Sequence, residues 1–210
     1  GWRYLLGALV TSVAVGSLDQ ALGVAAAAAA ACGADGNGHL SVDVRSDRVE
    51  LTLQAAASAD VTTRDIELAH GVTDAVRDLD LETEPGRRPV QTLEVGIDAM
   101  DIPAIRPFWK AVLGYVDDPG RDDPTDPIVD PVRKGPAIWF QQMDEPREQR
   151  NRIHFDITVP HDEAEARIAA ALAAGGRLLS DRRARAFWIL ADAEGNEVCV
   201  CTWQDRDPPG

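Results

Sequence analysis

The sequence predicts an α+β protein of two domains, at residues 1–81 and 92–204, with a linker at residues 82–91. Segments that alternate polar and apolar residues, typical of strands, are interleaved with segments whose apolar residues recur at helical spacing. The linker is dense in Pro, Gly and charged residues and has no hydrophobic periodicity. After it, a strand followed by a helix and three strands occurs twice, roughly 60 residues apart, which indicates an internal duplication.

The first domain is expected to begin with extended chain at residues 2–15. Ser17 is a typical N-cap for a helix that continues through an alanine run, and Gly33 follows the end of that run. Residues 39–44 and 48–53 alternate polar and apolar across a short turn, which predicts a β-hairpin with one buried face.

A second helix in this domain is expected to begin after Thr62 or Thr63, because threonine is a favoured N-cap. Its predicted apolar stripe consists of Ile66, Leu68, Ala69, Val72, Ala75, Val76 and Leu79. The first domain is therefore predicted to be a strand-helix-hairpin-helix unit.

The second domain is predicted to contain two βαβββ modules. The expected strands are at residues 92–99, around 115, 128–129 and 137–142, and then at 152–159, 177–180, 186–190 and 197–203. Asp101 is expected to cap the first helix, which runs to Leu113 before Gly114. The second helix is expected at residues 162–174, and two glycines close it.

Charge and cysteine content restrict the partners and the compartment. The formal net charge of -14 disfavours nucleic acid, because the chain repels phosphate backbones. The apolar run at residues 5–15 is too short to cross a bilayer, so no membrane partner is expected. Three sparse cysteines do not form a disulfide framework, which favours a reducing, cytoplasmic location.

Several motifs of the second domain occur in a characteristic order. They are Asp98-Ala-Met-Asp-Ile-Pro, Phe108-Trp109, Leu113-Gly114-Tyr115, Arg152-Ile-His-Phe-Asp and Asp192-Ala-Glu-Gly-Asn-Glu. Together they resemble the glyoxalase / bleomycin-resistance / dioxygenase superfamily, also called the vicinal-oxygen-chelate superfamily. The resemblance implies curved half-sheets whose inner faces enclose a divalent metal and a small-molecule substrate.

The resemblance also implies which positions line that pocket. Ligands on the first strand of each half fall on Glu94 and His154, and those on the last strand fall on Trp139 and Cys199, with Gln141 one inward step farther. Glu94, His154 and Cys199 are chemically able to bind zinc or nickel, but tryptophan is not. A metal-free pocket is therefore expected. If a metal binds, Glu94 and His154 are its expected ligands.

Each of these residues also has an ordinary structural interpretation. Glu94 can form an ion pair with an arginine, His154 can bind substrate or fill space, and Cys199 can be a small core residue. Trp139 can line an aromatic cavity or pack in the core as an ordinary tryptophan.

Three pieces of the first domain point to another family. They are Gly1-Trp2, Val42-Asp-Val-Arg with Arg48-Val, and Thr62-Thr-Arg-Asp65. They resemble pterin-4a-carbinolamine dehydratase, whose site has a His-His-Pro segment, a later Thr-His and an Asp. Laid on this chain without gaps, these fall on Gly38-His39-Leu40, Ala55-Ala56 and Asp65.

The resemblance implies a pterin substrate and catalytic roles for His39 and Asp65. Dehydration of a carbinolamine needs an acid for the leaving hydroxyl and a base for the ring proton, and histidine suits both. Only one of the family's three histidines is present, so the activity is expected to be impaired. Asp65 is expected to cap its helix rather than to contact substrate.

Three functions remain open from the sequence. The first is a 4a-hydroxytetrahydrobiopterin dehydratase-like lyase with an appended glyoxalase-like domain. The second is metal-free binding of a small molecule, including natural-product tailoring, in the second domain. The third is a metal-dependent isomerase or lyase of the glyoxalase type. A homo-oligomer is compatible with each of them.

Overall fold

The computed structural model describes residues 1–85, 93–146 and 154–205. These residues divide into two compact units, Gly1–Thr92 and Leu93–Gly210, here called the N-terminal and C-terminal units. Most of the predicted linker lies outside the described residues. Its described part includes Thr83–Glu84, which form strand β5 and pair with β2, so this segment belongs to the N-terminal sheet.

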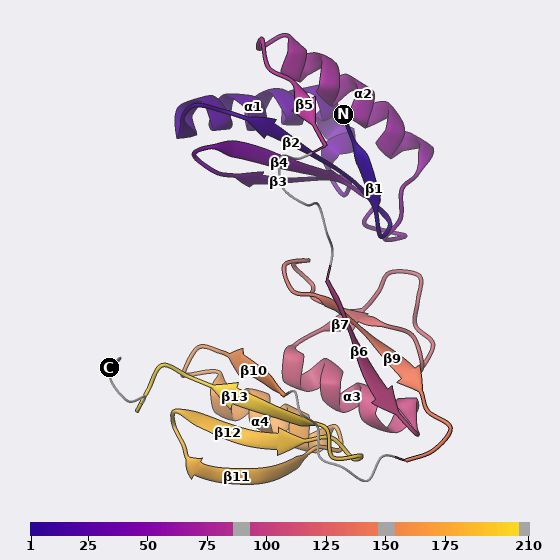
Figure 1. Ribbon diagram of the computed structural model, residues 1–210, viewed down its shortest axis with the longest axis vertical. Helices are drawn as coiled ribbons and strands as arrows, with labels where there is room; N and C mark the ends of the chain where they lie inside the picture. Colours follow the sequence, from indigo (N-terminus) through magenta and orange to yellow (C-terminus); the bar gives the residue numbers. More distant parts are fainter. Residues whose placement is uncertain (86–92, 147–153, 206–210) are drawn as a thin grey trace. The chain divides into compact units, whose positions relative to one another are not determined.

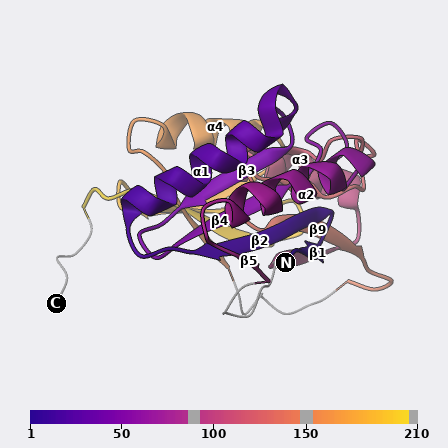
Figure 2. The same cartoon turned by 90° about the horizontal axis from the view of Figure 1, so that it is seen from above.

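The N-terminal unit is one antiparallel sheet with two helices (Figure 1). Its elements are β1 (Arg3–Leu5), β2 (Ala8–Ala14), α1 (Leu18–Cys32), the 3-10 helix η1 (Gly33–Gly36), β3 (Leu40–Val44), β4 (Arg48–Leu53), α2 (Thr63–Arg77) and β5 (Thr83–Glu84). The strand order is β1-β2-β4-β3, with β5 beside β2. Figure 2 shows both helices on the same side of this sheet.

Both helices begin as the sequence predicts. The Ser17 hydroxyl accepts a hydrogen bond from the Gln20 backbone N–H at the start of α1, and Thr62 caps α2. The core is formed by buried side chains of the sheet and the helices: Val13, Val49, Leu51, Leu53, Ala21, Val24, Ala28, Leu68, Val72 and Val76. Apolar burial of this kind supplies most of the stability of such a unit.

The predicted apolar stripe of α2 is wrong at its two ends. Ile66 is 49% exposed and Leu79 is 42% exposed. Ile66 comes directly after the buried Asp65, about 100° farther around the helix, so it faces away from the sheet. Leu79 lies beyond Arg77, where α2 ends.

The C-terminal unit contains the predicted duplication. Its elements are β6 (Glu94–Ala99), α3 (Ile102–Leu113), β7 (Val116–Asp117), β8 (Ile128–Val129), β9 (Ala137–Gln142), β10 (Phe155–Thr158), α4 (Ala164–Ala173), β11 (Arg177–Arg183), β12 (Phe187–Ala191) and β13 (Glu197–Cys201). The two sheets have equivalent strand orders, β6-β9-β8-β7 and β10-β13-β12-β11. In each, the first strand is parallel to the last. Residues 92 and 152–153, predicted to be in strands, lie outside the described residues.

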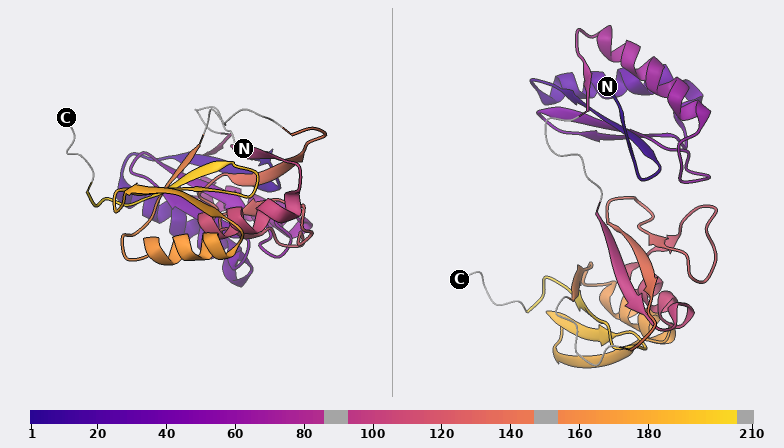
Figure 3. Two further views of the ribbon diagram at one scale, coloured as in Figure 1. Left: turned by 90° about the horizontal axis from the view of Figure 1, so that it is seen from below. Right: turned by 45° about the vertical axis from the view of Figure 1, so that its right-hand side comes forward.

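Helices α3 and α4 pack on one face of the two sheets, as Figure 3 shows most clearly for α4. Trp109 of α3 is buried between the halves: its indole Nε1–H donates to Asp192 Oδ2 at 2.9 Å, and its ring meets Phe155 edge-on. One core therefore serves both halves. The opposite face of each sheet, here called the helix-free face, carries no helix among the described residues.

In the described ranges, no helix has the length and apolar character needed to span a membrane. None of the three cysteines, Cys32, Cys199 and Cys201, forms a disulfide bond.

Candidate functional sites

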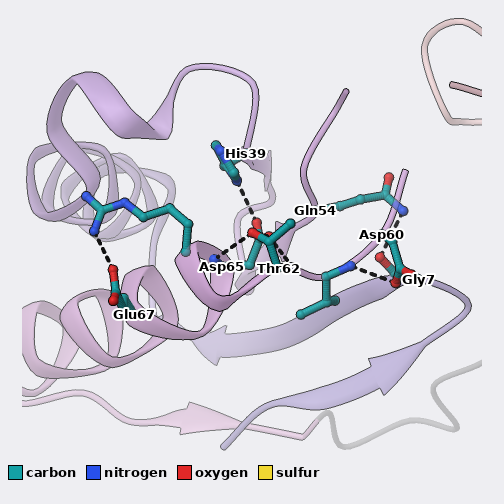
Figure 4. Close-up of polar contacts among 9 residues, drawn as sticks. Gly7, His39, Gln54, Asp60, Thr62, Asp65 and Glu67 are labelled. Atoms are coloured by element: carbon teal, nitrogen blue, oxygen red, sulfur yellow. Dashed lines mark hydrogen bonds and ion pairs between the residues drawn. The ribbon is translucent and has the colours of Figure 1, made fainter. Parts of the chain in front are cut away.

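His39 and Asp65 are in contact in the N-terminal unit. His39 lies in the turn between η1 and β3, and Asp65 lies in the first turn of α2. The His39 Nδ1 atom is 2.8 Å from Asp65 Oδ1 (Figure 4). The Asp65 side chain is fully buried, whereas 22% of the His39 side chain is exposed. An imidazole held in this way by a carboxylate can act as a general base through its other nitrogen.

Asp65 also caps α2, as the sequence predicts, so one carboxylate has both roles. Thr62 and Asp65 form a capping box, in which each side chain binds the backbone N–H of the other residue. Burial alone would raise the pKa of Asp65, but hydrogen bonds from Thr62 and His39 outweigh it and lower this pKa. The carboxylate is therefore ionised at neutral pH.

The other positions that the predicted resemblance assigns to the site form backbone hydrogen bonds in the structure. The Ala56 N–H donates to the Gly38 carbonyl at 2.8 Å, and the Gln54 N–H donates to the His39 carbonyl at 3.0 Å. These bonds hold the turn that carries His39. No second histidine stands at the positions of Gly38 or Ala56.

In the C-terminal unit, strands β10 and β13 place two candidate ligands on the helix-free face. Asp156 of β10 lies directly opposite Cys199 of β13 in the parallel pair. Val198 and Val200, on either side of Cys199 in β13, belong to the core under the helices. Because side chains alternate along a strand, Asp156 and Cys199 point to the other face.

His154 completes a compact group at the start of β10. One ligand atom each of His154, Asp156 and Cys199 lies within 4.8 Å of the other two. His154 Nε2 is 3.4 Å from Asp156 Oδ1. The side chains of His154 and Asp156 are 59% and 63% exposed, and Cys199 is buried. The group therefore opens to solvent and has the thiol at its base.

The Cys199 thiol is strongly held in its protonated form. Burial raises its pKa to about 12, and a hydrogen bond to the nearby Asp156 carboxylate contributes in the same direction. The thiol is thus neutral at physiological pH unless a bound cation displaces its proton.

The first half of this unit arranges its predicted residues differently. Glu94 and Trp139 lie on strands β6 and β9, where Trp139 is the register partner of Gly96. Trp139 is 38% exposed, and its indole packs so closely on Gly96 that a Cβ there would lie 2.9 Å from the ring. Gln141 is exposed and its side-chain amide donates to the Gln142 carbonyl. Among the described residues, the group of three that could hold a metal does not include Glu94.

The glyoxalase-like domain family matches residues 94–201, just over half of the 210 residues. The chain belongs to the glyoxalase-like domain family. The matched segment begins at β6 and ends at the last residue of β13, so it covers both modules of the C-terminal unit.

Solved structures similar to this glyoxalase-like protein cover about half of it. A glyoxalase/bleomycin resistance protein from Albidiferax ferrireducens T118 is 19% identical, with a TM-score of 0.41 over 52% of this chain and 95% of that chain. A genomically encoded fosfomycin resistance protein, FosX, from Listeria monocytogenes is 11% identical, with a TM-score of 0.43 over 56% and 94%. No curated protein matches the chain.

The donor atoms of the glyoxalase-like domain fit a divalent cation. Zinc is bound in proteins by imidazole nitrogen, carboxylate oxygen and thiolate sulfur, and His154, Asp156 and Cys199 offer one of each. Sites with three protein ligands keep a position for water or substrate. The 3.4 Å separation of His154 and Asp156 suits two ligands of one ion about 2 Å from each.

Asp156 is the residue that the sequence analysis missed. It stands two positions after His154, within the Arg-Ile-His-Phe-Asp motif, and side chains two apart on a strand share a face. That spacing was a usable signal. No such signal indicates that Asp156 pairs with Cys199 across β10 and β13, because the register of these two strands is set by tertiary packing.

Proposed function

We propose that the C-terminal unit binds a small organic molecule on its helix-free face and holds a divalent cation through His154, Asp156 and Cys199. The observation that carries this proposal is the grouping of three ligand atoms of zinc-binding type within 4.8 Å. Membership of the glyoxalase-like family supports a small-molecule ligand. The cation ligands thus differ from the expected pair, because Asp156 and Cys199 take the place of Glu94.

The three side chains have separate roles in this proposal. Cys199, at the buried base, would hold the ion as a thiolate, and the exposed His154 and Asp156 would hold it from the solvent side. A zinc ion bound there would supply Lewis-acid chemistry to an oxygen atom of the ligand. Trp139 and Glu94, on the helix-free face of the first sheet, are proposed to contact the organic part of the ligand.

Calorimetric titration of the full chain with zinc chloride tests the cation site. We expect one equivalent of zinc to bind. His154→Ala should lower the zinc affinity roughly 100-fold or more, because mutating even a residue that only hydrogen-bonds to a metal ligand costs about 10- to 100-fold. His161→Ala is the matched control, since His161 is an exposed histidine of the same unit that contacts Trp203. Equal affinities for the two variants would contradict the cation site and leave metal-free binding of a small molecule.

A second function is favoured by the contact between His39 and Asp65 at 2.8 Å. We propose that the N-terminal unit is a dehydratase-like lyase acting on a hydroxylated pterin, with His39 as its base and Asp65 as the group that orients it. The family's acid histidine is missing, so water must protonate the leaving hydroxyl. The expected rate is therefore at least about 100-fold below that of a complete site.

The test is the rate of quinonoid dihydropterin formation from 4a-hydroxytetrahydropterin in the presence of the full chain. We expect a measurable acceleration over buffer that disappears in His39→Ala. An unchanged rate in that variant contradicts the lyase function and leaves the C-terminal proposal intact.

A homo-oligomer and a cytoplasmic location are also proposed. The first is supported by strand β3, which lies at the edge of its sheet among the described residues, and the second by three cysteines that form no disulfide. Light scattering of the purified chain tests the oligomer.

A further inference from the structure

The carboxylate of Asp65 is held from two sides. Its Oδ1 atom faces His39 Nδ1 at 2.8 Å. Its Oδ2 atom accepts two hydrogen bonds from Thr62, one from the hydroxyl at 2.6 Å and one from the backbone N–H at 2.8 Å. Figure 4 shows Thr62 and His39 on either side of this buried group. The orientation of the Asp65 carboxylate is thus fixed by hydrogen bonds to His39 on one oxygen and to Thr62 on the other.

These bonds determine which proton each group carries. An ionised carboxylate only accepts hydrogen bonds, so the Thr62 hydroxyl must donate to Oδ2 and His39 must donate from Nδ1 to Oδ1. The Thr62 oxygen is then oriented to accept the Asp65 backbone N–H, which lies 3.5 Å away. Neutral imidazole has one N–H, so its proton is on Nδ1 and the lone pair is on Nε2.

We infer that Thr62 is a positioning residue for His39: by fixing Asp65, it keeps the His39 proton on Nδ1 and presents Nε2 as the basic nitrogen. The inference rests on the proposed lyase function of the N-terminal unit. Among the described residues Thr62 has no hydrogen bond to His39, and in this proposal it does not contact the substrate. Without its hydroxyl, one oxygen of a fully buried carboxylate loses its shortest hydrogen bond, and the carboxylate can rotate away from the imidazole.

A helix cap has a stability role as well, and the chain offers a way to separate the two. Ser17 caps α1 of the same unit through a side-chain hydrogen bond to a backbone N–H, as Thr62 caps α2. The cap bond of Ser17 involves no carboxylate and no histidine. Ser17→Ala therefore removes a cap from this unit and leaves the Thr62–Asp65–His39 contacts in place.

The experiment is nitrogen-15 NMR of the histidine rings in the full chain without any ligand, with His39 assigned by its loss in His39→Gln. We expect the wild type to show His39 as the Nδ1–H form, with a slowly exchanging Nδ1 proton. Thr62→Val should give a mixture of both forms and an exchange rate at least roughly tenfold faster, as expected for one lost hydrogen bond to a charged group. Thr62→Ser, which keeps the hydroxyl, should restore the wild-type signals.

Two further variants make the result decisive. Thr62→Gly lacks the hydroxyl but keeps a favoured N-cap residue, so it reports on His39 even if the valine variant unfolds. Ser17→Ala should leave the His39 signals unchanged. The inference is overturned if Thr62→Gly retains the slowly exchanging Nδ1 proton, or if Ser17→Ala changes the His39 signals as much as Thr62→Gly does. Because no substrate is present, this outcome is independent of whether the lyase activity exists.

Discussion

The two units each bring a histidine and an aspartate together, but in opposite surroundings. Asp65 is fully buried and hydrogen-bonded on both oxygens, whereas the Asp156 side chain is 63% exposed and 3.4 Å from His154. A buried, satisfied carboxylate fixes its histidine in one orientation, which suits proton transfer. Exposed ligands around a buried thiol can close on an ion. The difference in burial therefore suits the first pair to the proposed proton transfer and the second to the proposed cation binding.

The largest effect is expected when the thiol at the base of the His154, Asp156 and Cys199 group is removed. Cys199→Ser should lower zinc affinity roughly 100-fold or more, because serine does not supply a thiolate. In the wild type, the pKa of Cys199 is raised to about 12, so binding at neutral pH must release its proton. The affinity should therefore rise about tenfold per pH unit from Cys199 alone.

This proton release is measured by calorimetry in buffers of different ionisation enthalpy. The titrations are repeated across a range of about two pH units, roughly from pH 6.5 to 8.5. Cys201→Ser is the matched control, since Cys201 is a second buried thiol on the same strand that is not part of the group. Loss of affinity in both variants to the same extent would contradict a specific role for Cys199.

A comparable effect is expected in the N-terminal unit on rate rather than on affinity. His39→Ala should reduce pterin dehydration about 100-fold, or to the buffer rate, because it removes the base. His70→Ala should leave the rate unchanged, since His70 is an exposed histidine on α2. Stopped-flow absorbance measures both. A rate that falls equally in the two variants would show that general destabilisation, not loss of a base, is responsible.

A smaller effect concerns acid stability. Because the pKa of Asp65 is lowered in the folded chain, its ionised form contributes stability that is complete above the unfolded value of about 3.9. That stability is lost as the pH falls through the lowered value. Asp65→Asn should cost about 1–3 kcal/mol at neutral pH and progressively less below about pH 4.

Urea unfolding followed from neutral pH down to about pH 2 measures this difference. A constant gap between the wild type and Asp65→Asn across that range would mean that Asp65 contributes packing and not charge.

The smallest effect is expected on the helix-free face of the first sheet. Gly96→Ala places a methyl group against the Trp139 indole, which is 38% exposed and able to move outward. We expect a loss of about 1 kcal/mol or less in stability and a change in tryptophan fluorescence. Unchanged fluorescence would contradict the packing of Trp139 on Gly96.

The local elements were predictable where short-range chemistry decides them. The sequence predicts helix starts at Ser17, at Thr62 or Thr63, and at Asp101, and the structure has them at Ser17, Thr62 and Asp101. The duplication in the second domain is visible in the sequence as a repeated strand and helix pattern. Capping depends on residues three positions apart, so the sequence carries that information directly.

The sites were less predictable because their contacts cross between elements. The approach of His39 to Asp65 spans 26 positions, and that of Asp156 to Cys199 depends on the register of two strands. Family spacing pointed to Glu94, whereas the described residues group His154 with Asp156 and Cys199. Ile66 was misjudged because helical periodicity does not fix where the buried face begins.

The cobalt form of the full chain tests the central claim most directly, namely that His154, Asp156 and Cys199 form one cation site. With one equivalent of cobalt(II), we predict a thiolate-to-cobalt charge-transfer band and four-coordinate ligand-field absorption. The band should be absent in Cys199→Ser, and the ligand-field spectrum should change in Asp156→Asn. Cobalt that does not bind, or that binds without the thiolate band, would contradict the claim.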